Sequence, residues 1–245
     1  MTMQDREHWV TQGNLEEILR KRDTHEVDSL EWKELNELKA EWLEYHKPSN
    51  KEEIIYFEET ALLDIPHGFS IVEKLPYLPF DVMKRSLLEH HPEKRHPIPY
   101  AIVRHKRRYF FILRENGSGE LRLIGKKGML GGHVGKEDID HETNNLSKTI
   151  LNGLMRELQE EANIEAPMIV SIHLKGLIKG EEGVDADHLG IIFEIELDTD
   201  DIDTQEEGVQ KGIWIHENDL KNHYPSFESW SKIVYDHVLY PVDLR

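Results

Sequence analysis

Three glutamates lie close together in a segment whose apolar residues follow a helical period. Glu157, Glu160 and Glu161 occupy positions i, i+3 and i+4 of a helix that we expect from about residue 145 to 162. At 100° per residue these side chains share one face, nearly opposite the apolar stripe. Carboxylates within one turn repel one another, and Mg²⁺ and Mn²⁺ prefer oxygen ligands of this kind. The spacing indicates a divalent metal site; solvated surface glutamates are the alternative in a chain with 48 acidic residues.

Two features beside this helix favour the metal site. Gly131 and Gly132 precede it, and glycines let backbone carbonyls approach a ligand without an intervening Cβ. Asn163 follows it, and asparagine tolerates the left-handed conformation that ends many helices. Together they predict a ligand-binding loop followed by a helix with a defined end.

The residues Arg156–Ile164 resemble the second half of the Nudix hydrolase box, G-x(5)-E-x(7)-R-E-U-x-E-E-x-G-U, in which U is apolar. Every fixed position of that half matches except the last glycine, which is Asn163 here. Phrases at Leu130–Val134, at His188–Phe193 and from Glu207 to Trp214 are similar to a bacterial subfamily of predicted Nudix phosphoesterases. The resemblance covers about residues 51 to 245.

The first half of the box departs from the pattern. Arg156 lies 24 positions after Gly132, whereas the box has 14, and we place the ten extra residues in the acidic segment 136–145. Lys148 stands where the box has a glutamate that pairs with the arginine. We expect Asp140 or Glu142 to substitute for that glutamate.

The resemblance implies an α+β fold, in which a mixed β-sheet is sandwiched between helices and a catalytic loop–helix–loop lies beside it. It also implies a metal-dependent pyrophosphohydrolase or phosphoesterase, in which water attacks phosphorus in a small nucleoside-diphosphate-type substrate. Arg156 would orient Glu157 and Glu160. Mg²⁺ or Mn²⁺ would be held by Glu157, Glu160, Glu161 and the backbone of Gly131 or Gly132.

A further carboxylate from a later loop completes the site in many relatives. Our candidate is Glu207, with Glu206 and Glu182 as alternatives, and an ordinary loop glutamate is an equally open interpretation of Glu207. We predict that substrate phosphate is contacted by Arg104, Arg114 and His133. The alternative for His133 is a ring that packs beside the glycine loop.

The altered loop leaves a second function open, which is a catalytically weak or inactive Nudix-fold module that binds a nucleotide or regulates a partner. Lys148 in place of the usual acid supports that alternative. The isopentenyl-diphosphate isomerase branch of the fold relies on a catalytic cysteine, and this chain has no cysteine. We favour hydrolysis because the metal-binding half of the box is intact.

Two regions with different patterns must position these residues. Residues 1–50 predict a helical N-terminal extension, and residues 51–245 predict the Nudix domain, with a core at about 97–245 and a strand–helix segment at 51–96. The extension carries an apolar stripe at Leu35, Leu38, Trp42 and Tyr45. That stripe packs either on this chain or on a second copy, which would make a homodimer through the N-terminal helices.

Within the predicted Nudix domain, strands surround the helix that carries the glutamates. We expect further helices at about 80–88 and 226–239. The strands are expected at 54–57, 98–104, 109–114, 121–124, 169–178, 189–197 and 212–216.

The composition limits the partners of the chain. Its net charge of −18 argues against nucleic-acid polymers and anionic membranes, whereas the resemblance implies a small diphosphate-containing substrate. Without cysteine, disulfides, thiolate metal sites and cysteine nucleophiles are excluded. No two of the 15 histidines have the H-x(3)-H spacing of a zinc site. No apolar run reaches 18 residues, and the expected location is cytoplasmic.

Overall fold

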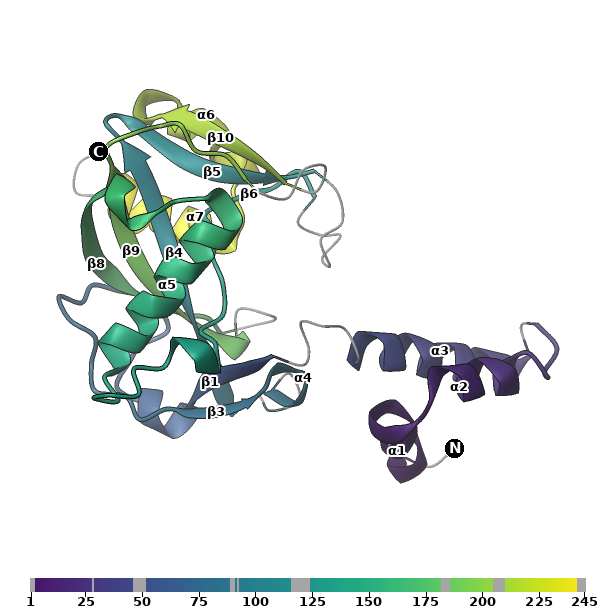
Figure 1. Ribbon diagram of the computed structural model, residues 1–245. Helices are drawn as coiled ribbons and strands as arrows, with labels where there is room; N and C mark the ends of the chain where they lie inside the picture. Colours follow the sequence, from purple (N-terminus) through teal and green to yellow (C-terminus); the bar gives the residue numbers. More distant parts are fainter. Residues whose placement is uncertain are drawn as a thin grey trace. The chain divides into compact units, whose positions relative to one another are not determined.

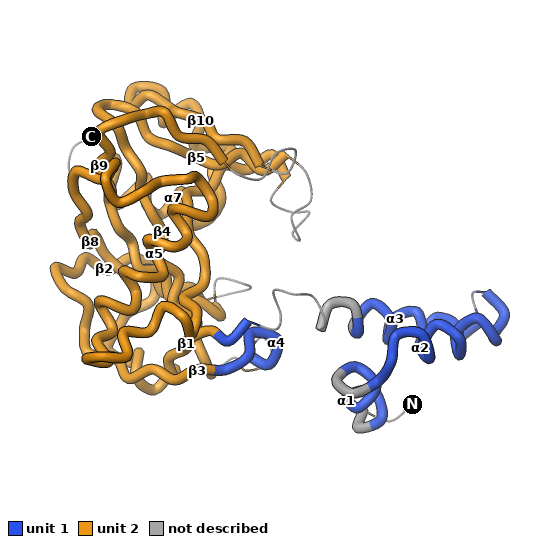
Figure 2. The backbone as a smooth tube through the Cα atoms, in the orientation of Figure 1, with its two compact units in different colours: residues 1–53, 83–90 blue, residues 54–82, 91–245 orange. Residues whose placement is uncertain are grey.

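The computed structural model describes residues 3–27, 29–45, 52–88, 91, 93–115, 124–181, 186–204 and 210–241. The chain divides into two compact units, which Figure 2 shows in different colours. The first unit contains Met1–Glu53 and Met83–His90, and the second contains Ile54–Val82 and His91–Arg245. We describe each unit by itself.

Three helices form most of the first unit: α1 (Met3–Gln12), α2 (Leu15–Arg22) and α3 (Leu30–Tyr45). The side chain of Asn14 caps α2 and fixes its start. Both α1 and α2 contact α3, and Ile18 and Leu38 are buried. The indole of Trp42 donates a hydrogen bond to the carbonyl of Gly13 at 2.9 Å. The predicted stripe therefore packs within its own unit at Leu38 and Trp42, and the homodimer stays a prediction.

A mixed β-sheet organises the second unit. The strand order is β10-β5-β4-β9-β8-β2, in which β4 and β9 are parallel and the other neighbours are antiparallel. Four strands pair outside this order, since β1 and β7 pair with β4, β3 pairs with β1 and β6 pairs with β5. The strands are β1 (Glu53–Glu58), β2 (Gly68–Ser70), β3 (Asp81–Lys84), β4 (Lys94–His105), β5 (Arg108–Arg114), β6 (Lys127–Gly128), β7 (Leu130–Gly131), β8 (Ile169–Lys179), β9 (His188–Leu197) and β10 (Gln210–His216).

Helices cover both faces of this sheet (Figure 1). Side chains alternate along β4, so Ala101 and Val103 pack in one cluster with Leu154 of α5 (Leu146–Ala162). Ile102 points the other way, into a cluster with Trp230 and other residues of α7 (Ser229–Val234). The short helix α6 (Leu220–His223) lies on the α7 side of the sheet through buried Leu220. The predicted architecture, a mixed sheet between helices, is confirmed.

Two of the predicted helices are shorter in the structure, because residues at their starts pair with strands instead. Asp81–Lys84 forms strand β3, which pairs with β1, so only Arg85–Leu88 (α4) is helical and the predicted helix at 80–88 is half wrong. The last helix starts at Ser229, not at residue 226, because Phe227 bridges Lys127. Its final turn, Tyr235–Leu239, is π-helical. Most of the strand predicted at 121–124 lies outside the described residues.

One carboxylate joins two buried cations at the edge of the sheet. Arg95 on β4 and Lys179 on β8 are 5% and 3% exposed. Glu59 binds both, through Nε of Arg95 and through Nζ of Lys179 at 2.8 Å. Arg95 and Lys179 also donate to backbone carbonyls. The cluster fixes the ends of β4 and β8 near the start of β9.

No helix among the described residues is long and apolar enough to cross a membrane.

Candidate active site

Helix α5 carries the three predicted glutamates, and asparagine residues cap both of its ends. The side chain of Asn145 accepts a hydrogen bond from the N–H of Lys148 at 3.1 Å and caps the start. Asn163 ends the helix in the left-handed conformation, with φ 52° and ψ 34°. That conformation explains why asparagine can stand where the box has glycine. The buried residues Leu154 and Leu158 hold the opposite face of the helix on the sheet.

The glycine pair lies directly against the acidic face of α5. The N–H of Gly131 donates to the carboxylate of Glu161 at 3.0 Å. A Cβ on Gly132 would lie within 3.0 Å of the Glu157 carboxylate, so a larger residue at this position would displace that carboxylate. The structure thus brings together the two predicted parts of the site, the loop and the helix.

Arg156 connects the helix to the loop with all of its guanidinium nitrogens. Nη1 donates to Glu157 at 2.8 Å and to Glu160 at 3.0 Å. Nη2 donates to the carbonyl of His133 at 2.8 Å and, with Nε, to Asp138 at 2.9 and 3.1 Å. Burial lowers the pKa of Arg156, but the hydrogen bonds and charges of Asp138 and Glu157 outweigh this effect and raise the pKa above its ordinary value. Arg156 therefore binds both Glu157 and Glu160, and its role in orienting them for a metal ion stays a prediction.

The carboxylate that supports Arg156 is Asp138, and the prediction of Asp140 or Glu142 is wrong. Asp138 is 5% exposed, and it also accepts a hydrogen bond from the N–H of Gly135 at 2.8 Å. Asp140 instead binds Nζ of Lys148 at 2.8 Å and the hydroxyl of Thr143. These bonds lower the pKa of Asp140 to about 2. The prediction failed because the longer loop folds a 3-10 turn at Lys136–Asp138, which turns Asp138 toward the helix.

Asp140 and Lys148 have a different use in the longer loop. Besides the ion pair, the N–H of Asp140 donates to the hydroxyl of Thr149 at 3.0 Å, and its carbonyl accepts from the N–H of Asn144 at 2.8 Å. The loop is therefore tied to the first turn of α5. Glu142 is largely exposed, with its carboxylate 4.0 Å from Lys148.

The acidic face of α5 fits a divalent ion by its donor chemistry. Glu157, Glu160 and Glu161 offer carboxylate oxygens, and the adjacent glycine backbone offers carbonyl oxygens, which are the ligands that Mg²⁺ and Mn²⁺ prefer. Burial, together with the charges of Glu160 and Asp138, raises the pKa of Glu157, although Arg156 opposes the shift. Among the described residues, the three carboxylates do not gather within 4.8 Å of one another, because Arg156 holds two of them and Gly131 the third.

Comparison with known proteins identifies the fold. No protein-family model matches the chain. YmaB of Bacillus subtilis is 29% identical over 159 residues, which cover 63% of this chain and 76% of YmaB. The crystal structure of Tm1382, a candidate Nudix hydrolase, matches with a TM-score of 0.61 at 22% identity, over 74% of this chain and 95% of that one. The chain has the Nudix fold. Because Arg156–Ile164 resembles the Nudix box, we call helix α5 and the preceding glycine loop the Nudix helix and the Nudix loop.

A second set of side chains, which sequence reasoning missed, supports the Nudix loop from the other face of the sheet. The hydroxyl of Tyr100 donates to Glu228 at 2.6 Å and accepts from the N–H of Met129 at 3.1 Å. Burial raises the pKa of Tyr100 well above its ordinary value, and the charge of Glu228 adds to the shift. A Cβ on Gly128 would meet the carboxylate of Glu228. No sequence signal joins Tyr100 to Glu228, because 128 positions separate them.

The two predicted phosphate-binding arginines lie in different surroundings. Arg104 is neutralised by β9, with Glu194 at 3.0 Å and Glu196 at 2.7 Å. By strand alternation it lies on the α7 side of the sheet, so the structure does not bring it to the glutamates of α5. Arg114 ends β5 beside the Nudix loop, with Nε 3.9 Å from the carboxylate of Glu228.

Of the four remaining predicted residues, one lies among the described residues and three do not. His133 directly follows the glycine pair, and its ring packs against those of His96 and His188. No spacing in the sequence signals this group, since its members come from three separate segments. The three candidates for a later carboxylate, Glu182, Glu206 and Glu207, lie outside the described residues.

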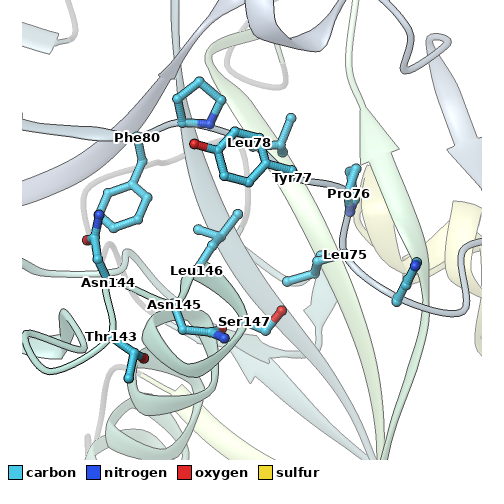
Figure 3. A pocket seen from close by; sticks show the side chains of 12 residues that line it. Leu75, Pro76, Tyr77, Leu78, Phe80, Thr143, Asn144, Asn145, Leu146 and Ser147 are labelled. Atoms are coloured by element: carbon cyan, nitrogen blue, oxygen red, sulfur yellow. The ribbon is translucent and has the colours of Figure 1, made fainter.

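A cavity of about 560 Å³ lies at the opposite end of the Nudix helix (Figure 3). Tyr77 and Phe80 line one side of it, and Asn145 and Ser147 at the start of α5 line the other. At 1.5 Å per residue, the helix separates this cavity from Glu160 by roughly 20 Å. It is therefore a separate feature from the acidic face.

Proposed function

We propose that this chain is a divalent-metal-dependent Nudix hydrolase, which cleaves a phosphoric anhydride bond in a small nucleoside-diphosphate-type substrate by attack of water on phosphorus. The observation that carries the proposal is the close approach of the glycine pair to Glu157 and Glu161 on the Nudix helix. On an ordinary surface helix, carboxylates point into solvent and do not pack against the backbone of a glycine loop.

In this proposal Glu157, Glu160 and Glu161 hold Mg²⁺ or Mn²⁺ together with the backbone of Gly131 or Gly132. When bound, the ion neutralises charge on the diphosphate and lowers the pKa of water. Arg156 orients the helix carboxylates, since it binds Oε1 of Glu157 and leaves Oε2 for the ion or for water. Glu207, Glu206 or Glu182 supplies the later carboxylate.

For the substrate we propose that Arg114 contacts phosphate, because it lies beside the Nudix loop and has, among the described residues, one carboxylate neighbour at 3.9 Å. Arg104 is the weaker candidate, since two glutamates already neutralise it. His133 is a further candidate for a substrate contact, because its half-buried ring lies beside the Nudix loop. The net charge of −18 favours a small anionic substrate that arrives with its metal over a polymer.

The test is a hydrolysis screen with Mg²⁺ and with Mn²⁺, coupled to product identification. It covers nucleoside triphosphates, sugar nucleotides, ADP-ribose, dinucleoside polyphosphates and coenzyme A. Glu160→Gln should lower turnover by roughly 10²–10⁴-fold, as for other positioned catalytic groups. This side chain is 60% exposed, so the fold should tolerate the change. Glu165→Gln, just beyond the helix, is the matched control, and equal turnover in both variants would refute the site.

A nucleotide-binding or regulatory module is the second candidate function. It is favoured by Lys148, which binds Asp140 in the longer loop where the box has a glutamate. Equilibrium binding of a nucleotide, with no hydrolysis across the same panel and both metals, would select it over the hydrolase.

A further inference from the structure

Three histidine side chains meet beside the Nudix loop. His96 on β4 and His188 on β9 are paired across the parallel strands, and His133 follows the glycine pair. Nδ1 of His96 lies 3.4 Å from Nε2 of His133. One ligand nitrogen from each ring lies within 4.8 Å of the other two. We propose that these three imidazoles form a binding site for one divalent transition-metal ion of the zinc class.

One measured separation has the value expected for two ligands of such an ion, and the third ring lies close enough to complete the group. A tetrahedral zinc ion holds imidazole nitrogens at about 2.0–2.1 Å, which places two of them roughly 3.3–3.4 Å apart. The separation between His96 and His133 has this value. A hydrogen bond between these two rings would explain their contact but not the third ring, whose centroid lies 5.1 Å from that of His96 and 5.4 Å from that of His133.

The ligand chemistry separates this site from the acidic face of the Nudix helix. Imidazole nitrogens suit Zn²⁺, Ni²⁺ and Cu²⁺, whereas carboxylate and carbonyl oxygens suit Mg²⁺ and Mn²⁺. Three protein ligands leave a fourth position for water or another ligand atom, which is typical of exchangeable or catalytic zinc and not of closed structural sites. His96 is 2% exposed and the other two rings are half-buried, so an ion enters from the side of His133 and His188.

A metal ion on the three histidines would also hold the Nudix loop in place, because His133 belongs to that loop. Arg156 binds the carbonyl of this residue at 2.8 Å and so attaches its backbone to the Nudix helix. An ion on the three rings attaches its side chain to β4 and β9. The loop that contacts Glu157 and Glu161 is then held from two sides. The proposed ion has no part in the hydrolysis proposed above, so either proposal can fail without the other.

The experiment is a metal titration of the full chain, made without a histidine tag and stripped of metal by a chelator. Co²⁺ reports nitrogen ligation at low coordination number by its visible absorption, and Zn²⁺ affinity is measured by competition with a chromophoric chelator. With Mg²⁺ in excess to occupy the acidic face of the Nudix helix, we expect one equivalent to bind at the histidines. His133→Gln and His188→Gln should each lower affinity by about 100-fold or more, since even outer-shell changes cost 10–100-fold. His173→Gln, an exposed histidine on β8, should leave affinity unchanged, as should Glu160→Gln.

Failure to bind one equivalent would overturn the proposal, as would binding that survives in both histidine variants or that disappears in Glu160→Gln. X-ray absorption on the zinc-loaded unmodified chain gives a measure that does not depend on whether the variants fold. It should count three imidazole ligands, and a smaller number would also overturn the proposal. A negative hydrolysis screen beside a confirmed zinc site would reject only the proposed enzyme.

Discussion

Replacing Asp138 with alanine should destabilise the second unit, which has the Nudix fold and is called the Nudix unit below. The loss should far exceed that from replacing the neighbouring acidic residue Glu137. The carboxylate is 5% exposed and accepts three hydrogen bonds, two from Arg156 and one from the N–H of Gly135. Removing one partner of a buried ion pair costs about 3–5 kcal/mol. Arg156 keeps its bonds to Glu157, Glu160 and the carbonyl of His133. The expected loss is therefore at the lower end, about 3 kcal/mol.

Glu137→Ala is the matched control for this prediction. Glu137 is the preceding residue and is also within reach of Arg156, at 3.9 Å, but its side chain is 65% exposed. An exposed pair of this kind contributes about 0–1 kcal/mol. A third variant, Asp140→Ala, distinguishes a general effect of the loop from an effect on Arg156. It removes a carboxylate of the same loop whose ion pair is with Lys148.

The assay is urea unfolding of the full chain. Pulsed hydrogen exchange in peptides of α5 measures the unfolded fraction at each urea concentration. This probe reports the Nudix unit and not the N-terminal helices. With a denaturant slope of about 2 kcal/mol per molar, a loss of about 3 kcal/mol lowers the midpoint by about 1.5 M urea. A loss below about 1 kcal/mol in Asp138→Ala, or an equal loss in Glu137→Ala, would refute the assignment of Asp138 as the partner of Arg156.

Three further predictions concern other contacts. Gly132→Ala should lower turnover by about 100-fold, measured as kcat on an identified substrate, because its Cβ must displace the Glu157 carboxylate; full activity would contradict the close approach. Glu59→Gln should cost about 3–5 kcal/mol in urea unfolding, since it leaves two buried cations without their carboxylate, and a loss under 1 kcal/mol would contradict this. Since the pKa of Asp140 is lowered to about 2, its stabilising ion pair is complete above about pH 4 and is lost as the pH falls toward 2. Lys148→Met should reduce this acid sensitivity in thermal melts, and an unchanged profile would exclude the pair as its source.

The sequence was sufficient for the parts of the site that local rules determine. The helix end at Asn163, the acidic face of α5 and the glycine pair all follow from local patterns within one helix and one loop. The longer strands of the sheet, β4, β5, β8, β9 and β10, followed from their apolar runs in the same way, whereas the short strands β2, β6 and β7 were not predicted. The α+β architecture, in contrast, came from the resemblance to the Nudix box and not from any one pattern.

Long-range contacts could not be predicted, because they depend on how separate segments meet. The partner of Arg156 depended on a 3-10 turn in the enlarged loop, which put Asp138 where spacing favoured Asp140 or Glu142. The histidine group depends on the parallel register of β4 and β9, which pairs His96 with His188. Strand β3 formed where local pattern favoured a helix, because β1 offered a pairing edge.

The most direct test of the central claim is Mn²⁺ binding, measured by electron paramagnetic resonance on the full chain without any substrate. The account predicts that Mn²⁺ binds the unmodified chain, that affinity falls by about 100-fold or more in Glu157→Gln and Glu160→Gln, and that His133→Gln binds normally. Binding that is unchanged in both glutamate variants, or that is lost only in His133→Gln, would contradict the claim that the acidic face of the Nudix helix is the catalytic metal site.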